Sequence, residues 1–220
     1  MPDDADDDRA AERVGMLAAV EADFADTARD TGCARLDDAV RAALAAVPRH
    51  RFVPPPWRER AYENRPLPIG HGQTISQPFI VALMTQLLAL RPGDRVLEIG
   101  TGCGYQAAVL ARLAAHVTSV EIVPALGLRA QQTLAALGVA NVELHVDDGH
   151  AGWPPGAPYD AVIATAAAES LPPAWLEQLA PIGERHGAQD LQVWRKDAAG
   201  VVTQQRSLAV RFVPLLDAAP

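Results

Sequence analysis

Apolar residues recur along the chain with two different spacings. Between residues 9 and 48 they stand three or four positions apart, as in Leu36, Val40 and Leu44, and this spacing predicts amphipathic helices over about 9–30 and 36–47. From residue 93 onward, short apolar runs alternate with longer amphipathic segments. The runs predict strands at 95–99, 117–121, 142–146 and 159–164, and the segments predict helices at 105–114, 124–137 and 173–179. Such alternation is typical of an α/β fold, a parallel sheet with helices on both faces.

The segment 51–78 follows neither spacing, and its many prolines and glycines do not allow long helices or strands. Phe52 and Ile69 are among its apolar anchors, so we expect an ordered loop region rather than a disordered linker. The tripeptide Ser-Gln-Pro at 76–78 predicts the start of a helix that runs to about residue 90. In this prediction Ser76 is the N-cap and the proline lies in the first turn.

We expect three regions along the chain. Residues 1–8 carry five aspartates and almost nothing apolar to bury, which predicts a disordered acidic tail. Residues 9–92 form an N-terminal helical region with a substrate loop, and residues 93–220 form the α/β core. These two regions pack as one compact domain. Within the core, strands at 191–195 and 201–212 are joined by a turn at 197–200.

Composition and charge argue against several classes of protein. Hydrophobic residues make up 49% of the chain and charged residues 21%, as in globular proteins rather than disordered or fibrous ones. The net charge of −8 argues against nucleic acid or an anionic membrane as a partner. The two cysteines fit a reducing compartment, the N-terminus lacks a secretion signal, and the longest apolar stretch, 79–90, is too short to span a bilayer. We therefore expect a cytoplasmic protein, and we expect it to be a monomer.

A glycine-rich turn follows the first strand of the predicted sheet. Gly100, Gly102 and Gly104 stand between that strand and the next helix, where glycine lets the backbone turn tightly and approach a ligand. Glu121 ends the second strand, where a carboxylate can accept hydrogen bonds from both ribose hydroxyls. Asp148 follows the third strand, where it can orient an adenine amino group. These positions fit a nucleoside lying across the carboxyl edge of the sheet.

The charge near the turn narrows the choice of nucleoside. The glycines run G-x-G-x-G, so the sequence has neither the dinucleotide fingerprint G-x-G-x-x-G nor the G-K-[ST] of a P-loop. Glu98 lies two residues before the first glycine, where its charge would repel a pyrophosphate and attract an ammonium or sulfonium group. The predicted ligand is therefore S-adenosylmethionine, a nucleoside with a cationic tail. The simpler alternative is a tight turn that binds nothing.

Other reactive side chains give weaker signals. Ser76 is either a helix cap or a catalytic hydroxyl, and its position alone favours the cap. Cys103 has no base beside it in the sequence, which indicates a small loop residue rather than a nucleophile. The six histidines show no metal-ligand spacing such as H-E-x-x-H, so we expect no metal site.

Longer motifs resemble one family. The stretches AYENRPLPIGHGQTISQPFIVALMTQLL (61–88) and GDRVLEIGTGCGYQAAVLA (93–111) resemble the protein-L-isoaspartate O-methyltransferases, and GQTISQP is the most specific part of the match. DDGHAGWPPGAPYDAVIATAAA (147–168) and VRFVPL (210–215) are similar to later motifs of that family. The likeness covers roughly residues 35–215.

The resemblance implies a Rossmann-like, S-adenosylmethionine-dependent methyltransferase that takes part in protein repair. Enzymes of this family methylate the free carboxyl group of L-isoaspartyl residues in damaged proteins and peptides, and the ester collapses to a succinimide that can reopen to aspartate. At matching positions, the resemblance makes Ser76 the active-site serine. The residues that it implies around the methyl donor are Thr74 and Ile75 in the pocket, Glu98, Gly100, Gly102 and Gly104 at the methionine part, Glu121 at the ribose and Asp148 at the adenine.

This chemistry agrees with the lack of metal and general-base motifs. The acceptor is a carboxyl group with a pKa of about 4, so it is already ionised at pH 7 and needs no strong base. Catalysis then depends mainly on positioning, and a hydroxyl such as that of Ser76 can orient the carboxylate by hydrogen bonding.

The chain departs from the family pattern after Leu179. The family has a glycine-rich turn and an apolar strand there, whereas this chain reads APIGERHG over 180–187. We therefore expect the fifth strand of the sheet to be lacking or rearranged, which would leave the edge of the strand at 159–164 unpaired. Two alternatives stay open: a methyltransferase of the same fold acting on a dedicated peptide or small molecule, and a catalytically impaired donor-binding protein.

Overall fold

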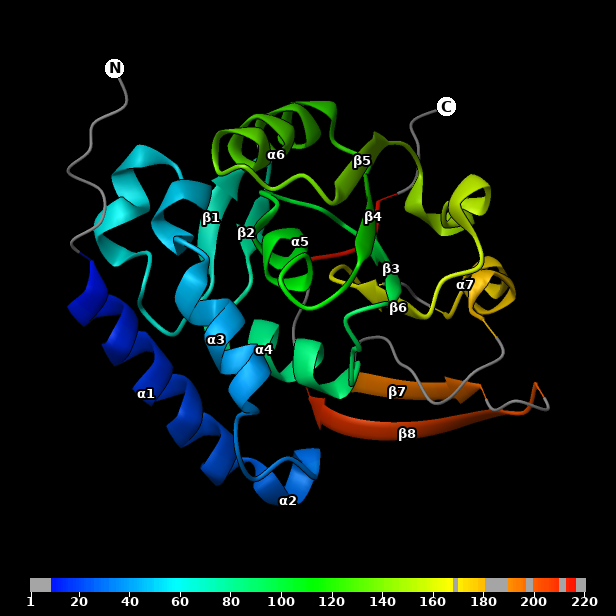
Figure 1. Cartoon of the computed structure of the whole chain (residues 1–220), viewed down its shortest axis with the longest axis horizontal. Coiled ribbons are helices and arrows are strands. Elements are labelled where there is room, and N and C mark those ends of the chain that lie inside the picture. Colours follow the sequence, from blue (N-terminus) through cyan, green and yellow to red (C-terminus); the bar gives the residue numbers. More distant parts are fainter. Residues whose placement is uncertain (1–8, 168–169, 181–189, 197–199, 210–212, 217–220) are drawn as a thin grey trace.

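The centre of the molecule is a four-stranded parallel sheet in the order β5-β4-β3-β6 (Figure 1). Its strands are β3 (Arg95–Ile99), β4 (His116–Glu121), β5 (Val142–Val146) and β6 (Ala161–Ala164), which confirms the four strands predicted for it. The structure is a computed structural model that describes residues 9–167, 170–180, 190–196, 200–209 and 213–216. The predicted acidic tail at 1–8 lies outside the described residues.

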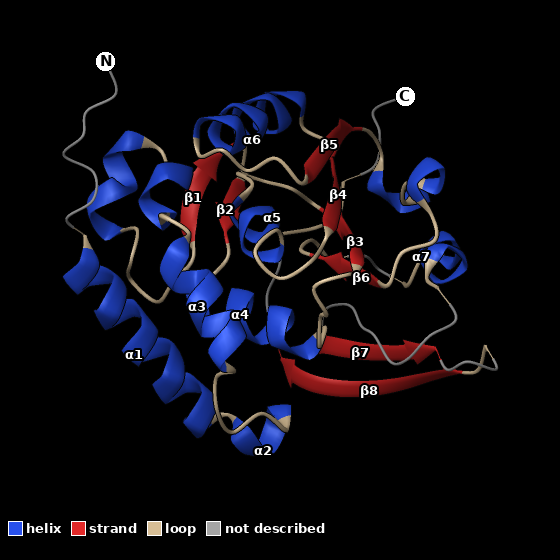
Figure 2. Cartoon of the chain, viewed as in Figure 1, coloured by secondary structure: helices blue, strands red, loops and turns tan. Residues whose placement is uncertain are grey.

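Helices occupy the predicted segments between the strands and before them (Figure 2). The N-terminal region contains α1 (Ala10–Asp26), α2 (Ala28–Thr31), α3 (Asp38–Ala46) and α4 (Pro78–Leu87), and the core contains α5 (Tyr105–Leu110), α6 (Pro124–Ala136) and α7 (Pro173–Gln178). The first predicted helix is divided into α1 and α2 because Thr27 leaves helical geometry, with a ψ of 6°. The other predicted helices are confirmed, with ends that differ by up to a turn.

The two faces of the sheet pack into two separate hydrophobic cores. Successive side chains of a strand point to opposite faces. Accordingly Val96 belongs to the larger core, which includes residues of α1, α3, α4, α5 and α6, whereas Leu97 and Ile99 belong to the smaller one. The smaller core contains Trp175 of α7 and Leu179. Side chains of both faces are buried, so the sheet is covered on both sides as predicted.

Helix α1 holds the loop that leads into α4. The Asp23 carboxylate accepts hydrogen bonds from Asn64 Nδ2 at 2.9 Å and from Gln77 Nε2 at 3.2 Å. The Asn64 Oδ1 atom in turn accepts a hydrogen bond from the Phe79 backbone N–H at 3.0 Å. The region 51–78 is therefore ordered, as the sequence predicted, and its last residues are tied to two helices.

A short antiparallel hairpin, β1 (Leu67–Gly70) and β2 (Gln73–Ile75), leads directly to Ser76. The predicted cap is wrong, because the N-cap of α4 is Gln77 and no side chain caps this helix. Pro78 opens the helix and has no N–H to satisfy, so the first turn has less need of a cap. Among the described residues, the Ser76 hydroxyl has no hydrogen-bond partner.

Strand β6 is an edge strand in the described part of the chain, where β3 is the only strand paired with it. Isolated parallel bridges join its flanking residues to other segments, one between Tyr159 and Leu179 and the other between Ala167 and Pro214. The expectation that the sheet lacks or rearranges its fifth strand agrees with this arrangement. The segment 181–187, where the sequence departs from the family pattern, lies outside the described residues.

The C-terminal strands β7 (Asp190–Lys196) and β8 (Val202–Ala209) form a separate antiparallel pair. Both strands were predicted, and most of the predicted turn between them, at 197–199, lies outside the described residues. Within the described ranges, no helix combines the length and the apolar character needed to cross a membrane.

Candidate active site

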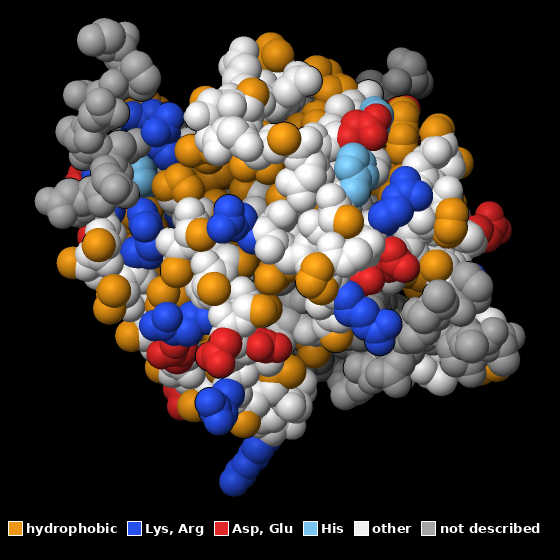
Figure 3. Space-filling view, in the orientation of Figure 1, with side chains coloured by type: hydrophobic (Ala, Val, Ile, Leu, Met, Phe, Trp, Pro, Cys, Tyr) orange, Lys and Arg blue, Asp and Glu red, His pale blue; other side chains and the backbone are white. Residues whose placement is uncertain are grey.

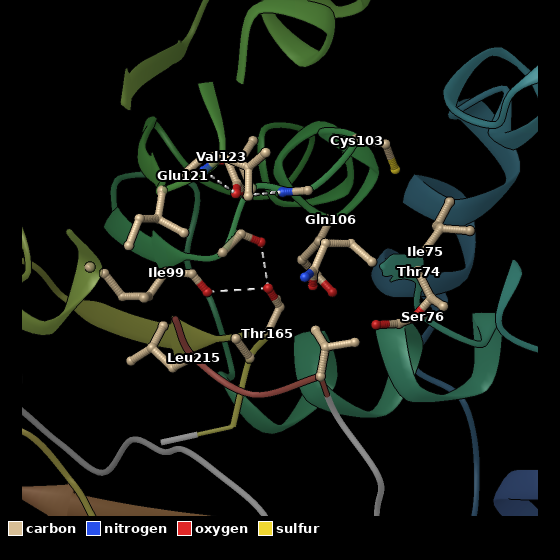
Figure 4. A pocket seen from close by; sticks show the side chains of 18 of the residues that line it. Thr74, Ile75, Ser76, Ile99, Cys103, Gln106, Glu121, Val123, Thr165 and Leu215 are labelled. Carbon is tan, nitrogen blue, oxygen red and sulfur yellow. Dashed lines mark hydrogen bonds between the residues drawn. The ribbon is translucent and has the colours of Figure 1, made fainter. Parts of the chain in front are cut away.

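A pocket opens at the carboxyl ends of β3, β4 and β6, and the end of β2 closes one side of it (Figure 4). Its empty volume, counted out to the open mouth, is about 740 Å³. The walls come from residues 73–76, 99–103, 105–106, 120–123, 165–166 and 213–216, together with Val81 and Gly149. Segments far apart in the sequence therefore meet at the edge of the sheet where the glycine-rich turn lies.

The predicted glycines of this turn all have left-handed backbone, with φ angles of +93° at Gly100, +56° at Gly102 and +87° at Gly104. Other residues rarely adopt such angles. At Gly100 a Cβ atom would also lie only 2.7 Å from Thr165 Oγ1. Gly100 and Gly102 line the pocket as predicted. Gly104 does not, because it faces α6, where its Cβ would meet Ala130 at 3.2 Å.

Glu121 lies in the pocket wall at the end of β4, as the sequence predicted. One carboxylate oxygen accepts a hydrogen bond from the Gly102 N–H at 2.6 Å and the other accepts one from the Val123 N–H at 2.9 Å (Figure 4). These bonds lock the glycine-rich turn to the neighbouring strand. Each carboxylate oxygen can accept more than one hydrogen bond, so Glu121 can still bind a ligand hydroxyl.

Glu98 does not line the pocket, contrary to the sequence-based expectation. Its side chain is fully buried in the sheet, where the Ser119 hydroxyl donates to one of its oxygens. The pKa of Glu98 is raised to about 8, mainly by burial; the Ser119 hydrogen bond opposes this rise, and the nearby Glu121 carboxylate makes a smaller contribution to it. The group is therefore mostly uncharged at pH 7 and does not supply the expected negative charge.

Asp148 also lies outside the pocket wall. Its Oδ1 atom accepts a hydrogen bond from the His150 backbone N–H at 2.9 Å and lies 2.8 Å from His150 Nδ1. The side chain thus caps the short turn that begins at Gly149. Gly149 itself lines the pocket, in close contact with the side chain of Ile99. The wall of the pocket at this point is therefore formed by Gly149, and a role of Asp148 toward a ligand stays a prediction.

Thr74, Ile75 and Ser76 form one wall, as predicted, and the Ser76 hydroxyl points into the space (Figure 4). Gln106 of α5 projects toward the same space in this view. Its Nε2 atom donates to Thr85 Oγ1 at 2.8 Å, which ties the amide to α4.

The sequence analysis did not assign Gln106, Thr165 or the segment 213–216 to the site, although all of them line the pocket. The Thr165 hydroxyl donates to the Ile99 carbonyl at 3.2 Å and also bonds the Gly100 carbonyl. Thr165 directly follows β6, and that place at the carboxyl edge was the available signal. The C-terminal segment is held by a hydrogen bond from the Leu215 N–H to the Ala167 carbonyl at 2.8 Å. Only the resemblance of VRFVPL to a family motif pointed to it.

The charge of the pocket suits a cationic nucleoside. Among the described residues that form its wall, Glu121 is the only Asp or Glu, and no Lys or Arg is present. Apolar side chains of Ile99, Ile122 and Val123 lie around it. A carboxylate with spare acceptor capacity suits a ribose diol, and a wall without cations suits a sulfonium. The residues present thus fit S-adenosylmethionine better than a pyrophosphate ligand.

Two further observations concern possible metal ligands and the thiol of Cys103. The described residues contain no group of three or more His, Cys, Asp or Glu side chains that could hold a metal ion. Cys103 is buried, and burial raises the pKa of its thiol to about 11. A thiol with this pKa is protonated at neutral pH and is therefore a poor nucleophile.

Comparisons with known proteins agree with this geometry. The family model described as protein-L-isoaspartate(D-aspartate) O-methyltransferase matches residues 21–219. The chain is 49% identical over 207 residues to protein-L-isoaspartate O-methyltransferase 2 of Polaromonas sp., a match that covers 91% of this chain and 98% of the relative. It is 53% identical over 184 residues to protein-L-isoaspartate O-methyltransferase of Gloeobacter violaceus, covering 80% and 89% of the two chains.

Solved structures agree as well. A protein-L-isoaspartate O-methyltransferase structure superposes with a TM-score of 0.78 at 26% identity, covering 94% of this chain and 66% of that longer one. A Plasmodium falciparum structure of the same family name, in complex with S-adenosyl-L-homocysteine, gives a TM-score of 0.73 at 21% identity and covers 92% and 97% of the two chains. This second likeness bears on the fold alone.

Proposed function

The chain belongs to the protein-L-isoaspartate(D-aspartate) O-methyltransferase family, and we propose that it uses the pocket at the carboxyl edge of its sheet to methylate the free carboxyl group of L-isoaspartyl residues in damaged proteins and peptides. It is an S-adenosylmethionine-dependent carboxyl methyltransferase of the Rossmann-like class. Of the two alternatives that the sequence left open, neither is favoured by a feature of the pocket wall.

The observation that carries the assignment of roles is the position of Ser76 in the wall of the same pocket that the glycine-rich turn lines. The hydroxyl points into the pocket and has no partner among the described residues, so it is available to a ligand. We assign it the role of orienting the acceptor carboxylate. Thr74 and Ile75 continue the same wall and would bound the space between donor and acceptor.

The opposite side of the pocket is assigned to the donor. S-adenosylmethionine, when bound, supplies an electrophilic methyl group on a cationic sulfur. Glu121 would accept hydrogen bonds from the ribose, and the backbone at Gly100 and Gly102 would follow the methionine part. Gly149 would lie at the adenine end, where the sequence had pointed to the neighbouring Asp148. Glu98 has a supporting role, through Ser119, in holding the turn.

The reaction requires little acid–base chemistry from the protein. An isoaspartyl carboxyl group with an ordinary pKa of about 4 is ionised at neutral pH. The side chains therefore have to exclude water and hold the carboxylate in line, and well-oriented reactants can gain about 7–11 kcal/mol in this way. The uncharged Ser76 and Thr74 hydroxyls suit such a positioning role, because they can donate hydrogen bonds to a carboxylate without a proton transfer.

The direct test is methylation of a matched pair of peptides. The full chain is incubated with labelled S-adenosylmethionine and either an isoaspartyl peptide or the same peptide with a normal aspartyl residue. We expect label in the isoaspartyl peptide and little in its twin. Equal labelling of both peptides would contradict the assigned acceptor. Donor binding without any labelling, measured by calorimetry, would instead support the donor-binding alternative.

We further propose that the enzyme acts as a cytoplasmic monomer without a nucleic-acid partner. Both cysteines are free thiols, which fits a reducing compartment. On the face shown in Figure 3, the Lys and Arg side chains are scattered among other surface and form no continuous basic patch. Light scattering at working concentration tests the oligomeric state, and a mass of twice 23.4 kDa would contradict the proposal.

A further inference from the structure

A positive charge is buried directly behind the Ser76 wall of the pocket. Arg49, in the turn η2 (Arg49–Phe52), has an exposed fraction of 0%. Its Nη2 atom donates to the Ser76 carbonyl at 2.7 Å, and its Nε atom donates to the Ala61 carbonyl at 2.8 Å. The guanidinium carbon lies 4.8 Å from the centre of the Tyr105 ring. Because Ser76 and Tyr105 both line the pocket, Arg49 is one residue away from its space.

This charge has no counter-ion in the described part of the chain. No carboxylate there forms an ion pair with Arg49, and its Nη1 atom is buried without a hydrogen-bond partner. The titratable groups that act on it are Tyr105, Cys103 and Tyr62, none of which is a carboxylate. Burial lowers the pKa of Arg49, but a guanidinium group is so strongly basic that it stays charged even in such surroundings.

A purely structural clamp would not need this charge. Two backbone carbonyls can be bridged by neutral amide donors, whereas burying an unpaired guanidinium costs free energy. The charge of the arginine also affects the electrostatic potential inside the pocket, because the low-dielectric interior between Arg49 and the pocket screens that charge only weakly. The pocket wall itself has no cation, among its described residues, that could attract an anionic acceptor.

We propose that Arg49 is a positioning residue for the acceptor: it fixes the backbone of Ser76 and gives this end of the pocket the positive potential that selects a carboxylate. The inference rests on the proposed function, whose acceptor is an anion. The two ends of the pocket then have opposite electrostatic potential. The Glu121 carboxylate lies toward the cationic donor, and the Arg49 guanidinium lies behind the anionic acceptor. The specific consequence is discrimination between a carboxylate and a neutral amide of the same shape.

The experiment compares two peptides that differ only in that charge. The dissociation constants of an isoaspartyl peptide and of its isoasparaginyl amide are measured by fluorescence anisotropy on the full chain saturated with S-adenosylhomocysteine, so that no methyl transfer occurs. The wild type is compared with Arg49→Gln, which can still donate to a carbonyl, with Arg49→Lys, which keeps the charge, and with Arg112→Gln, which removes an arginine outside the pocket, just after the end of α5.

We expect the wild type to bind the acid about tenfold more tightly than the amide. This ratio should fall close to one in Arg49→Gln and be largely retained in Arg49→Lys and Arg112→Gln. The affinity of Arg49→Gln for S-adenosylhomocysteine should stay within about twofold of the wild type, since a role in the acceptor site leaves the donor site intact.

A ratio near one in the wild type, or an unchanged ratio in folded Arg49→Gln, would overturn the inference and leave Arg49 as a clamp. Should Arg49→Gln fail to fold, the wild-type ratio and the Arg49→Lys ratio decide, and a low value in either contradicts the proposal. Failure of the proposed function is seen separately, as a wild-type protein that does not label the isoaspartyl peptide at all.

Discussion

Ser119 and Glu98 face each other across the neighbouring strands β4 and β3, and the Ser119 hydroxyl donates a hydrogen bond to the Glu98 carboxyl group. On its other side Ser119 Oγ lies 2.6 Å from Thr101 Oγ1, which is in the pocket wall. Three side chains therefore connect the centre of the sheet to the glycine-rich turn. The second oxygen of Glu98 is buried without a partner among the described residues. This leaves a nearly neutral carboxyl group at a place where an ionised one is costly.

The first prediction follows from that cost and concerns pH. The pKa of Glu98 is about 8 in the folded chain and close to its ordinary value of 4.5 when unfolded. Between these values the folded state binds more protons, so this group makes the free energy of unfolding decrease as the pH rises from about 4.5 to 8. Glu98→Gln, a neutral isostere, should remove that decrease. We expect the variant to be more stable than the wild type at pH 8 by about 1–3 kcal/mol, and similar to it near pH 4.

Chemical denaturation of both proteins at several pH values between about 4 and 9 measures this difference. Asp160→Asn is the control, because that carboxylate also accepts a hydrogen bond, from the Arg95 N–H at 2.8 Å, but is only partly buried. A difference between Glu98→Gln and the wild type that does not change with pH would show that Glu98 is ionised in the folded protein.

Ser76→Ala should separate catalysis from donor binding. A hydrogen bond to a charged group is worth about 1.5–3 kcal/mol, so loss of the hydroxyl should lower kcat for an isoaspartyl peptide by about 10–100-fold. S-adenosylhomocysteine affinity, measured by calorimetry, should stay within about twofold, and the stability should hardly change because Ser76 caps no helix. An equally large loss of donor affinity would mean that Ser76 belongs to the donor side.

Glu121→Gln should have the opposite pattern. Both of its carboxylate oxygens already accept backbone N–H bonds, from Gly102 and Val123, and an amide keeps only one acceptor oxygen. The NH₂ group would then face a backbone N–H, which disturbs the turn. We expect donor affinity to fall by about 10–100-fold, while the KM of the peptide at saturating donor changes little. Titration calorimetry with S-adenosylhomocysteine measures the first effect, and unchanged affinity would remove Glu121 from the donor site.

The sequence was most informative where local pattern and chemistry coincide. The strands from β3 to β6 coincide with short apolar runs. A glycine follows β3 and an acidic residue ends β4, so the place of these strands and the order of the site segments could be predicted. Gly100, Gly102 and Glu121 reach the pocket because the carboxyl ends of parallel strands share one edge. The prediction of Thr74, Ile75 and Ser76 rested on a family resemblance, since nothing in their spacing shows which wall they form.

Where the structure places a side chain outside the pocket wall, the physical reason is one that spacing does not reveal. Glu98 and Glu121 are both carboxylates near strand ends, and only the direction of the side chain decides that the first is buried in the sheet and the second faces the pocket. The Asp148 carboxylate accepts a hydrogen bond from the backbone of its own turn, and the sequence pattern does not show that this local bond competes with ligand binding. Arg49 could not be recognised at all, because its partners lie 12 and 27 residues away.

The last prediction concerns the tight contact between Gly149 and Ile99, both in the pocket wall. A Cβ at position 149 would lie 2.5 Å from Ile99 Cγ2, a distance that real Cβ atoms do not tolerate. Ile99 is fully buried and, being β-branched, cannot turn its Cγ2 away easily. Gly149→Ala should therefore move the turn into the pocket, cost about 1–3 kcal/mol of stability and weaken S-adenosylhomocysteine binding.

A double-mutant cycle shows whether this contact is the cause. Ile99→Ala alone should destabilise the protein by about 2–5 kcal/mol, because it leaves a cavity. In the double variant the methyl group added at position 149 occupies part of that space, so the combined loss should be smaller than the sum of the two single losses by about 1 kcal/mol or more. Donor affinity should recover in parallel, since the turn returns to its place. Simple additivity in both stability and affinity would mean that the backbone at 148–151 yields on its own and that Ile99 does not set the shape of this end of the pocket.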